Sequence, residues 1–151
     1  MLYKRSTIKK AESLNRQDKK LKRSCPFCDI ENQVEEVLDG NKTMSVIRNR
    51  VSYDFFEGVP ISDHLMIIPR QHHTNLGEFS AAEKHDYMEL LSEYESKGYS
   101  VYSRGVSNHE RSQPHLHTHL LMAEGRRSRY IFFSLKPYIL LASKPKTGKR
   151  W

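Results

Sequence analysis

The stretch QPHLHTHLL, residues 113–121, places three histidines at alternate positions, with apolar or β-branched residues between them. Successive side chains of a β-strand point to opposite faces, so His115, His117 and His119 are predicted to share one face of a strand. Neighbouring histidines on that face lie about 6.6 Å apart along the strand, and the outer two about 13 Å. Two neighbours can ligate one zinc ion, but three cannot reach the same ion without breaking the strand. The row is therefore not expected to form a simple three-histidine metal site.

The chemistry of imidazole suggests what such a row does instead. Imidazole is a neutral nucleophile near pH 7 and, once protonated, a donor to phosphate or to a leaving group. Two alternating histidines are more often solvent-facing residues of a half-buried strand. Three of them beside an apolar opposite face favour a site in which one ring attacks while its neighbours hold oxygens. The row is suited to group transfer at phosphorus.

The segments before the row alternate between strand and helix signals. Residues 43–49 (TMSVIRN) and 50–56 (RVSYDFF) are short β-favouring runs, and 63–69 (DHLMIIP) is the nearly continuous apolar run expected of a central strand. These three are predicted to be adjacent strands of one sheet. Further strands are predicted at 99–105, in the histidine row and at 129–135. With one long helix, the fold class is α+β with an antiparallel-leaning sheet.

Residues 80–98 (SAAEKHDYMELLSEYESKG) predict that helix. Ser80 and Glu83 have the spacing of a capping box, and Gly98 supplies the stop. The apolar stripe of the helix is predicted to contain Tyr87, Leu91 and Tyr94.

The net charge of +7 is unevenly distributed along the chain. Residues 1–24 hold nine Lys/Arg against two acidic residues, and residues 126–151 hold eight and no acid, whereas the middle of the chain is acidic. We expect a basic N-terminal extension at 1–24, one domain at 25–142 and a basic C-terminal tail at 143–151. The apolar residues within 6–23 have roughly the spacing of one face of a helix, which predicts a basic amphipathic helix there. The apolar patch at 138–142 is expected to dock on the domain. Basic segments of this kind bind nucleic acid or anionic surfaces, or only solubilise the chain.

Length and composition limit the class of protein. A chain of 151 residues with 37% hydrophobic content is expected to form one domain. It has no run of 18 apolar residues, and charged side chains among its first ten residues leave no apolar core of a signal peptide. We therefore expect a cytoplasmic protein without a membrane segment. The two cysteines, Cys25 and Cys28, are too few and too close together for a disulfide framework, which leaves a metal or redox role.

Four segments, in this order, resemble the histidine triad (HIT) superfamily: CPFCDI at 25–30, DHLMIIPRQHHTNL at 63–76, the helix at 80–98 and PHLHTHLL at 114–121. The resemblance covers about residues 25–122 and leaves both basic segments outside it. It implies a HIT-like fold and a homodimer. It also implies a nucleotide hydrolase or nucleotidyl transferase that acts at an α-phosphorus through a nucleotidyl-histidine intermediate, with no catalytic metal.

The same resemblance implies roles for individual residues. His117 is the nucleophile, and His119 binds phosphate oxygens and assists the leaving group. Ser112 matches a position that hydrogen-bonds the phosphate or the leaving group. Glu57 is the candidate for an acidic contact with the ribose, with Asp54 as the alternative.

The cysteine pair on its own indicates a redox pair, two core thiols or half of a tetrahedral zinc site. Zinc-containing HIT proteins combine this pair with two histidines whose positions match His72 and His115. The resemblance therefore implies a structural Zn²⁺ held by Cys25, Cys28, His72 and His115, with His73 competing for the place of His72. The other histidines, His64, His85 and His109, are predicted to be a strand, a helix-surface and a loop residue.

The loop at residues 103–114 (SRGVSNHERSQP) departs most from the family pattern. Arg111 stands where the family has Gln, and Ser103 or Arg104 stands where it has Asn. The substrate is therefore left open among phosphoramidates, dinucleoside polyphosphates and other nucleotidyl conjugates. Two alternatives also stay open: a nucleotide- or nucleic-acid-binding module with weak or no catalysis, and a HIT enzyme acting on adenylated nucleic-acid ends.

Overall fold

The computed structural model describes residues 2–4, 25–28, 30, 37–128, 131–135 and 138–142. The chain divides into two units, one made of residues 1–21, 51–63 and 123–151 and the other of residues 22–50 and 64–122. The helix predicted within 6–23 and the tail at 143–151 lie outside the described residues. The domain boundaries predicted from the sequence stay a prediction.

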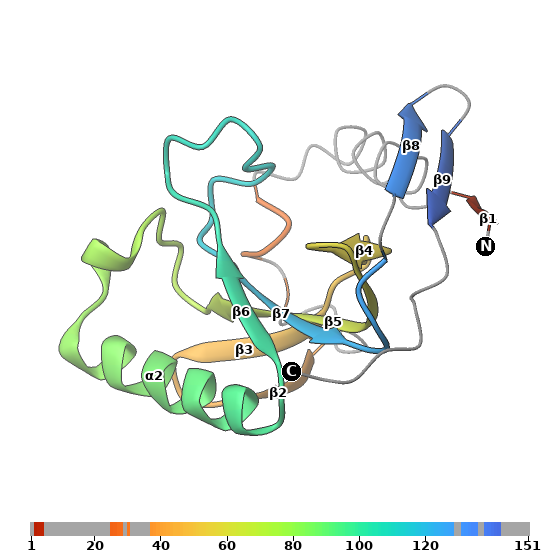
Figure 1. Ribbon diagram of the computed structural model, residues 1–151. Helices are drawn as coiled ribbons and strands as arrows, with labels where there is room; N and C mark the ends of the chain where they lie inside the picture. Colours follow the sequence, from red (N-terminus) through yellow and green to blue (C-terminus); the bar gives the residue numbers. More distant parts are fainter. Residues whose placement is uncertain are drawn as a thin grey trace. The chain divides into compact units, whose positions relative to one another are not determined.

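The main sheet has its strands in the order β2-β3-β5-β7-β6 (Figure 1). Its pairs β2/β3, β3/β5 and β6/β7 are antiparallel. The predicted α+β class and the adjacency of the strands at 43–49 and 63–69 are confirmed. The strands are β2 (Val37–Gly40), β3 (Met44–Arg48), β5 (Val59–Pro69), β6 (Ser100–Ser103) and β7 (Thr118–Ala123).

The helix α2 (Ala81–Ser96) begins and ends where the sequence predicts. The Ser80 hydroxyl accepts from the Glu83 N–H at 3.3 Å, and the Glu83 carboxylate accepts from the Ser80 N–H at 2.8 Å, which completes the capping box. Gly98 follows the helix with a φ of 91°, a conformation that glycine adopts readily. Among the described residues, no helix is long and apolar enough to cross a membrane.

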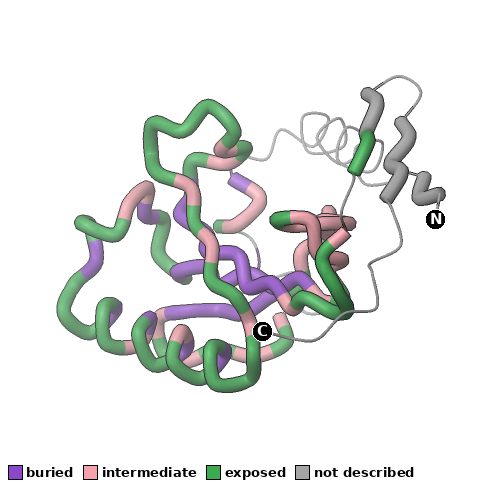
Figure 2. Tube along the Cα trace, viewed as in Figure 1, coloured by how far each residue is buried: buried purple, intermediate pink, exposed green. Residues whose placement is uncertain are grey.

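The core lies between α2 and one face of the sheet (Figure 2). Tyr87, Leu90 and Tyr94 are the buried apolar residues of the helix, so Leu90 takes the central place predicted for Leu91, which is only partly buried. The opposite face of β3 and β5 contacts a second cluster that includes Ile30. β5 is thus buried on both faces, which explains its continuous apolar run. The sheet residues facing α2 are Met44, Val46, Leu65, Ile67 and Leu120, and Leu116 from the segment before β7 joins them.

The histidine row differs from its prediction in one respect. β7 begins at Thr118, so His119 lies in the strand while His115 and His117 lie in the irregular segment before it. The cause is a backbone hydrogen bond: the Leu116 N–H donates to the His73 carbonyl at 2.7 Å, and pairing with β6 starts only at Thr118. Alternation nevertheless persists, because Leu116 and Leu120 both enter the core beside α2.

The first unit contains a hairpin and a small sheet. The prediction of a strand over 50–56 is wrong for most of its length, because only β4 (Phe55–Phe56) pairs, with the start of β5. Glu57 and Gly58 form the turn with φ values of 50° and 83°. Residues 138–142, predicted only as a docking patch, form a strand. The antiparallel sheet β1-β9-β8 consists of β1 (Leu2–Lys4), β9 (Tyr138–Ala142) and β8 (Ile131–Leu135).

Truncation of a fully buried strand residue tests this core. Leu120 is 0% exposed, and Leu120→Ala is expected to lower the free energy of unfolding by about 2–5 kcal/mol because it leaves a cavity. Urea denaturation measures the change. Val101 faces Leu120 across the β6/β7 pair but is 45% exposed, so Val101→Ala is the matched control with a much smaller expected effect. Equal losses in the two variants would contradict the assigned core.

Candidate functional site

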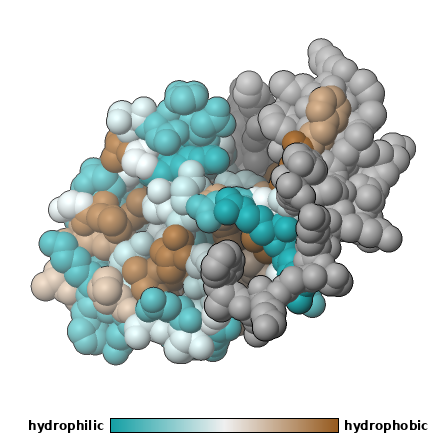
Figure 3. Space-filling model, in the orientation of Figure 1, coloured by the Kyte–Doolittle hydropathy of each residue, from teal (hydrophilic) through white to brown (hydrophobic). Residues whose placement is uncertain are grey.

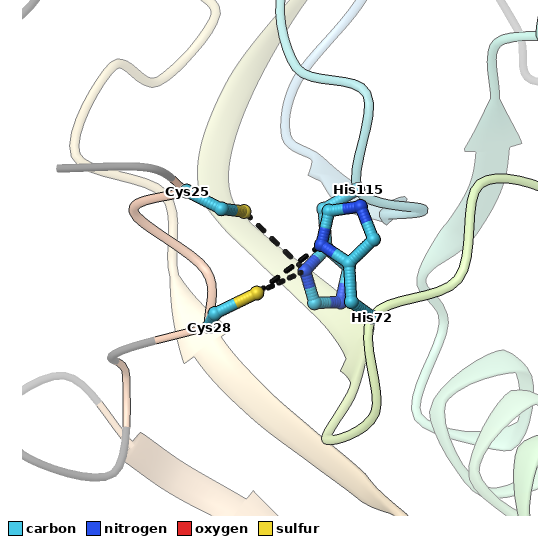
Figure 4. Close-up of side chains that lie close together, drawn as sticks. All are labelled: Cys25, Cys28, His72 and His115. Atoms are coloured by element: carbon cyan, nitrogen blue, oxygen red, sulfur yellow. Dashed lines mark hydrogen bonds between the residues drawn. The ribbon is translucent and has the colours of Figure 1, made fainter.

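Two cysteines and two histidines form a compact cluster (Figure 4). Cys25 and Cys28 lie on one turn, closed by a 3.2 Å hydrogen bond from the Cys28 N–H to the Cys25 carbonyl. The Cys28 Sγ lies 3.1 Å from Nδ1 of His72 and 3.6 Å from Nδ1 of His115, and the Cys25 Sγ lies 3.5 Å from the latter nitrogen. Ligands of tetrahedral zinc bound through sulfur and nitrogen lie about 3.3–3.8 Å apart. The two distances to His115 fall in this range and the 3.1 Å distance to His72 is slightly shorter, so the cluster is close to the spacing of such an ion.

The protonation of His115 also fits a metal ligand. Its Nε2 lies 2.9 Å from the Pro69 carbonyl, which only accepts, so Nε2 carries the proton and Nδ1 presents a lone pair to both sulfurs. Burial lowers the pKa of His115 to about 4 and keeps the ring neutral. Loss of solvent and the neighbouring Cys25 raise the pKa of the Cys28 thiol to about 11. A divalent cation would reverse that shift by stabilising the thiolates.

The structure separates the two adjacent histidines that competed for this cluster. His72 belongs to it, whereas the Nε2 of His73 lies 2.7 Å from the Glu83 carboxylate. The same Glu83 carboxylate closes the capping box of α2. His73 therefore connects the helix start to the backbone of Leu116, which donates to the His73 carbonyl.

His117 is buried with one nitrogen committed to the backbone. Its Nδ1 lies 2.9 Å from the His115 carbonyl, so Nδ1 is the protonated nitrogen and Nε2 keeps its lone pair. Burial lowers the pKa of His117, and the positive charges of Arg111 and Arg104 lower it further. The ring is consequently a neutral imidazole with one nucleophilic nitrogen.

The His119 ring contacts a histidine outside the triad, His64. Its Nδ1 is 2.9 Å from Nε2 of His64, which lies in β5, and the Asn49 side chain lies 3.0 Å from that same His64 nitrogen. Burial, followed by the proximity of His64, lowers the pKa of His119 to about 3. Tyr102 of β6 stacks on the His119 ring with a centroid distance of 5.9 Å. The triad histidines are thus buried and positioned by other side chains, not solvent-facing.

Known proteins resemble this chain in their three-dimensional structure but not closely in their sequence. No family model matches the chain, and no curated protein matches it. A HIT family hydrolase from Clostridium thermocellum superposes with a TM-score of 0.51 at 18% identity, over 68% of this chain and 92% of that protein. A histidine triad protein from Clostridium difficile gives 0.50 at 18% identity, over 72% and 97% of the two chains. A HIT family hydrolase from Legionella pneumophila gives 0.50 at 22% identity, over 71% and 97%.

This chain has the histidine triad fold. The resemblance inferred from its four sequence segments is confirmed at the level of the fold. Of the three triad histidines, His115 lies in the cluster with Cys25, Cys28 and His72, while His117 and His119 do not.

Two predicted residues of the histidine triad site stay predictions. Ser112 lies on the exposed loop before the triad and lines a hollow of about 360 Å³. Glu57 lies in the β4–β5 turn of the first unit and Asp54 just before β4, whereas the triad lies in the second unit. The proposed contact of Glu57 with a ribose is not tested by these positions.

Sequence reasoning missed two residues of the triad's surroundings. His64 was predicted to be an ordinary strand residue, and Tyr102 was assigned no role. The signal for His64 was a histidine in an otherwise apolar central run, since a buried polar side chain requires a partner. Tyr102 could be located only once the register placed it opposite His119.

The buried His119 predicts that the triad is sensitive to acid. Its pKa of about 3 in the folded protein lies below the value of about 6.5 in an unfolded chain. The unfolded chain therefore takes up a proton first. The contribution of His119 to stability is complete above pH 6.5 and is lost as the pH falls towards 3, by up to about 1.4 kcal/mol per pH unit.

Urea denaturation between about pH 7 and pH 4 measures this slope. His119→Gln is expected to show a slope smaller by about one proton. The exposed His85 is the control, and His85→Gln is expected to keep the wild-type slope. Identical slopes in His119→Gln and the wild type would show that His119 ionises in the folded protein.

Proposed function

We propose that this protein is a nucleotide phosphohydrolase or nucleotidyl transferase that acts at the α-phosphorus of nucleotidyl conjugates. The observation that carries the proposal is the protonation of His117. Its Nδ1–H is held by the His115 carbonyl, so Nε2 alone is available as a nucleophile. Burial lowers the pKa of the ring, so the nucleophile stays unprotonated at neutral pH.

The reaction proceeds in two displacements. Nε2 of His117 attacks the α-phosphorus, an N–P bond forms, and the bond from phosphorus to the leaving group breaks with its electron pair going to the leaving group. Water then attacks the same phosphorus and gives up one proton to the solvent, the N–P bond breaks with its electron pair returning to Nε2, and the nucleoside monophosphate is released with His117 neutral again. Another acceptor in place of water makes the protein a transferase.

Neighbouring side chains support these steps. His119 holds the phosphate oxygens, and its neutral ring is oriented by His64 and stacked on Tyr102. Ser112 is assigned to hydrogen-bond the phosphate or the leaving group from the loop before the triad. The positive charges of Arg104 and Arg111 act on His117 and favour an anionic reacting group there.

A Zn²⁺ ion held by Cys25, Cys28, His72 and His115 is part of this proposal as a structural group. Bound there, it would supply a cross-link between the cysteine turn and the triad segment. Phe27, between the two cysteines, contacts the rings of His115 and His117 with centroid distances of 5.9 Å and 5.4 Å. The cysteine turn therefore helps to position the nucleophile, and the reaction requires no metal at phosphorus.

Partners and location follow from the sequence and are proposals. They comprise a cytoplasmic homodimer and a nucleic-acid partner for the basic segments 1–24 and 126–151. Light scattering tests the dimer. Nucleic-acid binding by the full chain should weaken steeply with salt, and a flat salt dependence would contradict a role for these segments.

The experiment that tests the function compares the wild type with His117→Ala on two substrates. One is adenosine 5′-phosphoramidate and the other diadenosine tetraphosphate. Turnover by the wild type that is lost in the variant supports the proposal.

A further inference from the structure

Helix α2 contacts the histidine triad segment from the core side. The outer surface over α2 mixes hydrophilic and apolar side chains (Figure 3). Two polar residues of the helix point inward instead, since Glu83 is 7% exposed and Tyr87 8%. They are four residues apart and therefore lie on the same face of the helix. Each makes a buried hydrogen bond that leads to a neighbour of His117 in the chain.

Glu83 is linked to the residue before His117 by way of His73. The His73 Nε2 lies 2.7 Å from the Glu83 carboxylate, which only accepts, so Nε2 carries the proton and donates. The His73 carbonyl in turn accepts from the Leu116 N–H at 2.7 Å. The position of Leu116 therefore depends on a side chain that α2 holds in place.

His73 is also a buried anchor of the loop that carries it. Residues 70–80 connect β5 to α2 and are all described, and His73 and Phe79 are the two buried ones. Their rings meet edge to face with a centroid distance of 5.2 Å, and Phe79 meets Tyr87 in the same way at 5.6 Å. The carbonyl that receives the Leu116 N–H is thus fixed by ring packing as well as by Glu83.

Tyr87 is linked to the residue after His117. The Tyr87 and Thr118 hydroxyls share a hydrogen bond of 2.7 Å, and Thr118 is 1% exposed. Thr118 is also the first residue of β7, where pairing with β6 begins. An apolar side chain at this position would fill the same space but form no such bond. The hydroxyl pair therefore adds a directional contact between α2 and the start of the strand.

The two links hold both chain neighbours of the nucleophile. Leu116 and Thr118 contact the α2 side, so His117 between them faces the opposite side. Fixing the backbone on either side sets the direction of the His117 ring, whose Nδ1 lies 2.9 Å from the His115 carbonyl. This direction matters, because a displacement of about 1 Å at a reacting group can slow a reaction about 100-fold.

We propose that Glu83 and Tyr87 are positioning residues: acting through His73 and Thr118, they set the place from which Nε2 of His117 attacks. The inference rests on the proposed function and deepens it by adding residues of α2 to the machinery of the same site. The nucleophile is common to both substrates named above. Loss of a link should therefore lower kcat by the same factor on both and leave KM within about twofold of the wild type.

Two amide substitutions test the link through His73. His73→Gln places an N–H near the position of Nε2 and can still donate to Glu83, whereas His73→Asn reaches only as far as Nδ1. His73→Asn should lower kcat about 10- to 100-fold, the value of one charge-assisted hydrogen bond, and His73→Gln should recover most of it. A loss of kcat in His73→Asn that follows a loss of Zn²⁺ and is restored by added Zn²⁺ would assign the effect to the neighbouring His72 and overturn this link.

Removal of one hydroxyl tests the link through Thr118. Tyr87→Phe should lower kcat about 2- to 10-fold, the value of one neutral hydrogen bond. Tyr94→Phe is the matched control, because Tyr94 is another buried tyrosine of α2 whose hydroxyl donates to Asp39 at 3.0 Å. Asp39 lies in β2, which β3 and β5 separate from β7. Tyr94→Phe should keep the wild-type kcat, and an equal fall in both variants would show that kcat follows the stability of the helix.

A spectroscopic measurement separates this inference from the proposed function. Nitrogen NMR of isotope-labelled histidine rings reports which nitrogen carries the proton, and the His117 signal is assigned by its loss in His117→Gln. The wild type should show the Nδ1–H form of His117, His73→Gln should keep it, and His73→Asn should give a mixture of the two neutral forms.

The combined results distinguish the two claims. If the wild type turns over neither substrate but His73→Asn gives the mixture, the proposed function fails and the positioning of His117 by α2 stands. Turnover that depends on His117, with wild-type kcat in both His73→Asn and Tyr87→Phe, overturns the positioning and leaves the proposed function standing.

Discussion

His117→Ala is expected to abolish turnover of both adenosine 5′-phosphoramidate and diadenosine tetraphosphate, with kcat/KM falling at least about a thousandfold. The reason lies in how the three triad histidines are held in the described part of the chain. His115 has its Nδ1 facing two sulfurs, and His119 has its Nδ1 against His64. His117 alone presents Nε2 while a backbone carbonyl holds its other nitrogen. Release of nucleoside monophosphate, followed by chromatography, measures the effect.

The control for this experiment is a histidine outside the triad. His109 lies on an exposed loop, and His109→Ala should keep wild-type turnover. Rapid quenching at high pH should also trap a nucleotidyl group on the wild type, because the N–P bond of a phosphohistidine survives base and breaks in acid. Equal turnover in the wild type and His117→Ala, or no turnover in either, would refute the proposed function.

Cys25→Ser is expected to release the metal and to destabilise the protein. The purified wild type should contain about one Zn²⁺ per chain, and the variant much less than one. A ligand present at a thousand times its dissociation constant stabilises the folded state by about 4 kcal/mol, so Tm should fall by about 8–16 °C for a chain of this size. Elemental analysis and thermal unfolding measure the two effects. A chelator should lower the Tm of the wild type by a similar amount and leave that of Cys25→Ser unchanged.

Two comparisons make this result specific. His109→Ala removes a histidine outside the cluster and should retain both the metal and the Tm. Treatment of the wild type with a reductant separates a zinc site from a redox pair, since a disulfide between Cys25 and Cys28 would be broken by reductant and unaffected by chelator. Metal content that is the same in Cys25→Ser and the wild type would exclude the cysteine cluster as the zinc site.

The sequence predicted those parts of the fold whose signals are local. Ser80, Glu83 and Gly98 define the two ends of α2 because capping depends on residues within one helical turn. The run at 63–69 predicts a central strand because burial on both faces requires apolar residues at every position. Where the signal was weaker, the prediction was wrong: 50–56 reads as a strand, yet only Phe55 and Phe56 find a partner.

In the candidate site, too, the local pattern could be predicted from the sequence and the longer-range contacts could not. The alternation of histidines and apolar residues predicted that the histidines point away from the core beside α2. The structure keeps this alternation although β7 begins only at Thr118. Alternation could not say which nitrogen of each ring is free. That is decided by the carbonyls of Pro69 and His115, which take the protons of His115 and His117 and leave opposite nitrogens with lone pairs.

The sequence by itself determined the residue types in the site and its resemblance to the histidine triad fold. Only the tertiary structure decided that His72 joins the cysteines while His73 turns to Glu83, that His64 supports His119, and that Arg104 and Arg111 line one hollow with Leu116. The physical reason is the distance along the sequence between the groups that interact. Helix caps and strand alternation are set by neighbours in sequence, whereas ring protonation, metal ligation and the charge of a pocket depend on groups brought together from distant parts of the chain.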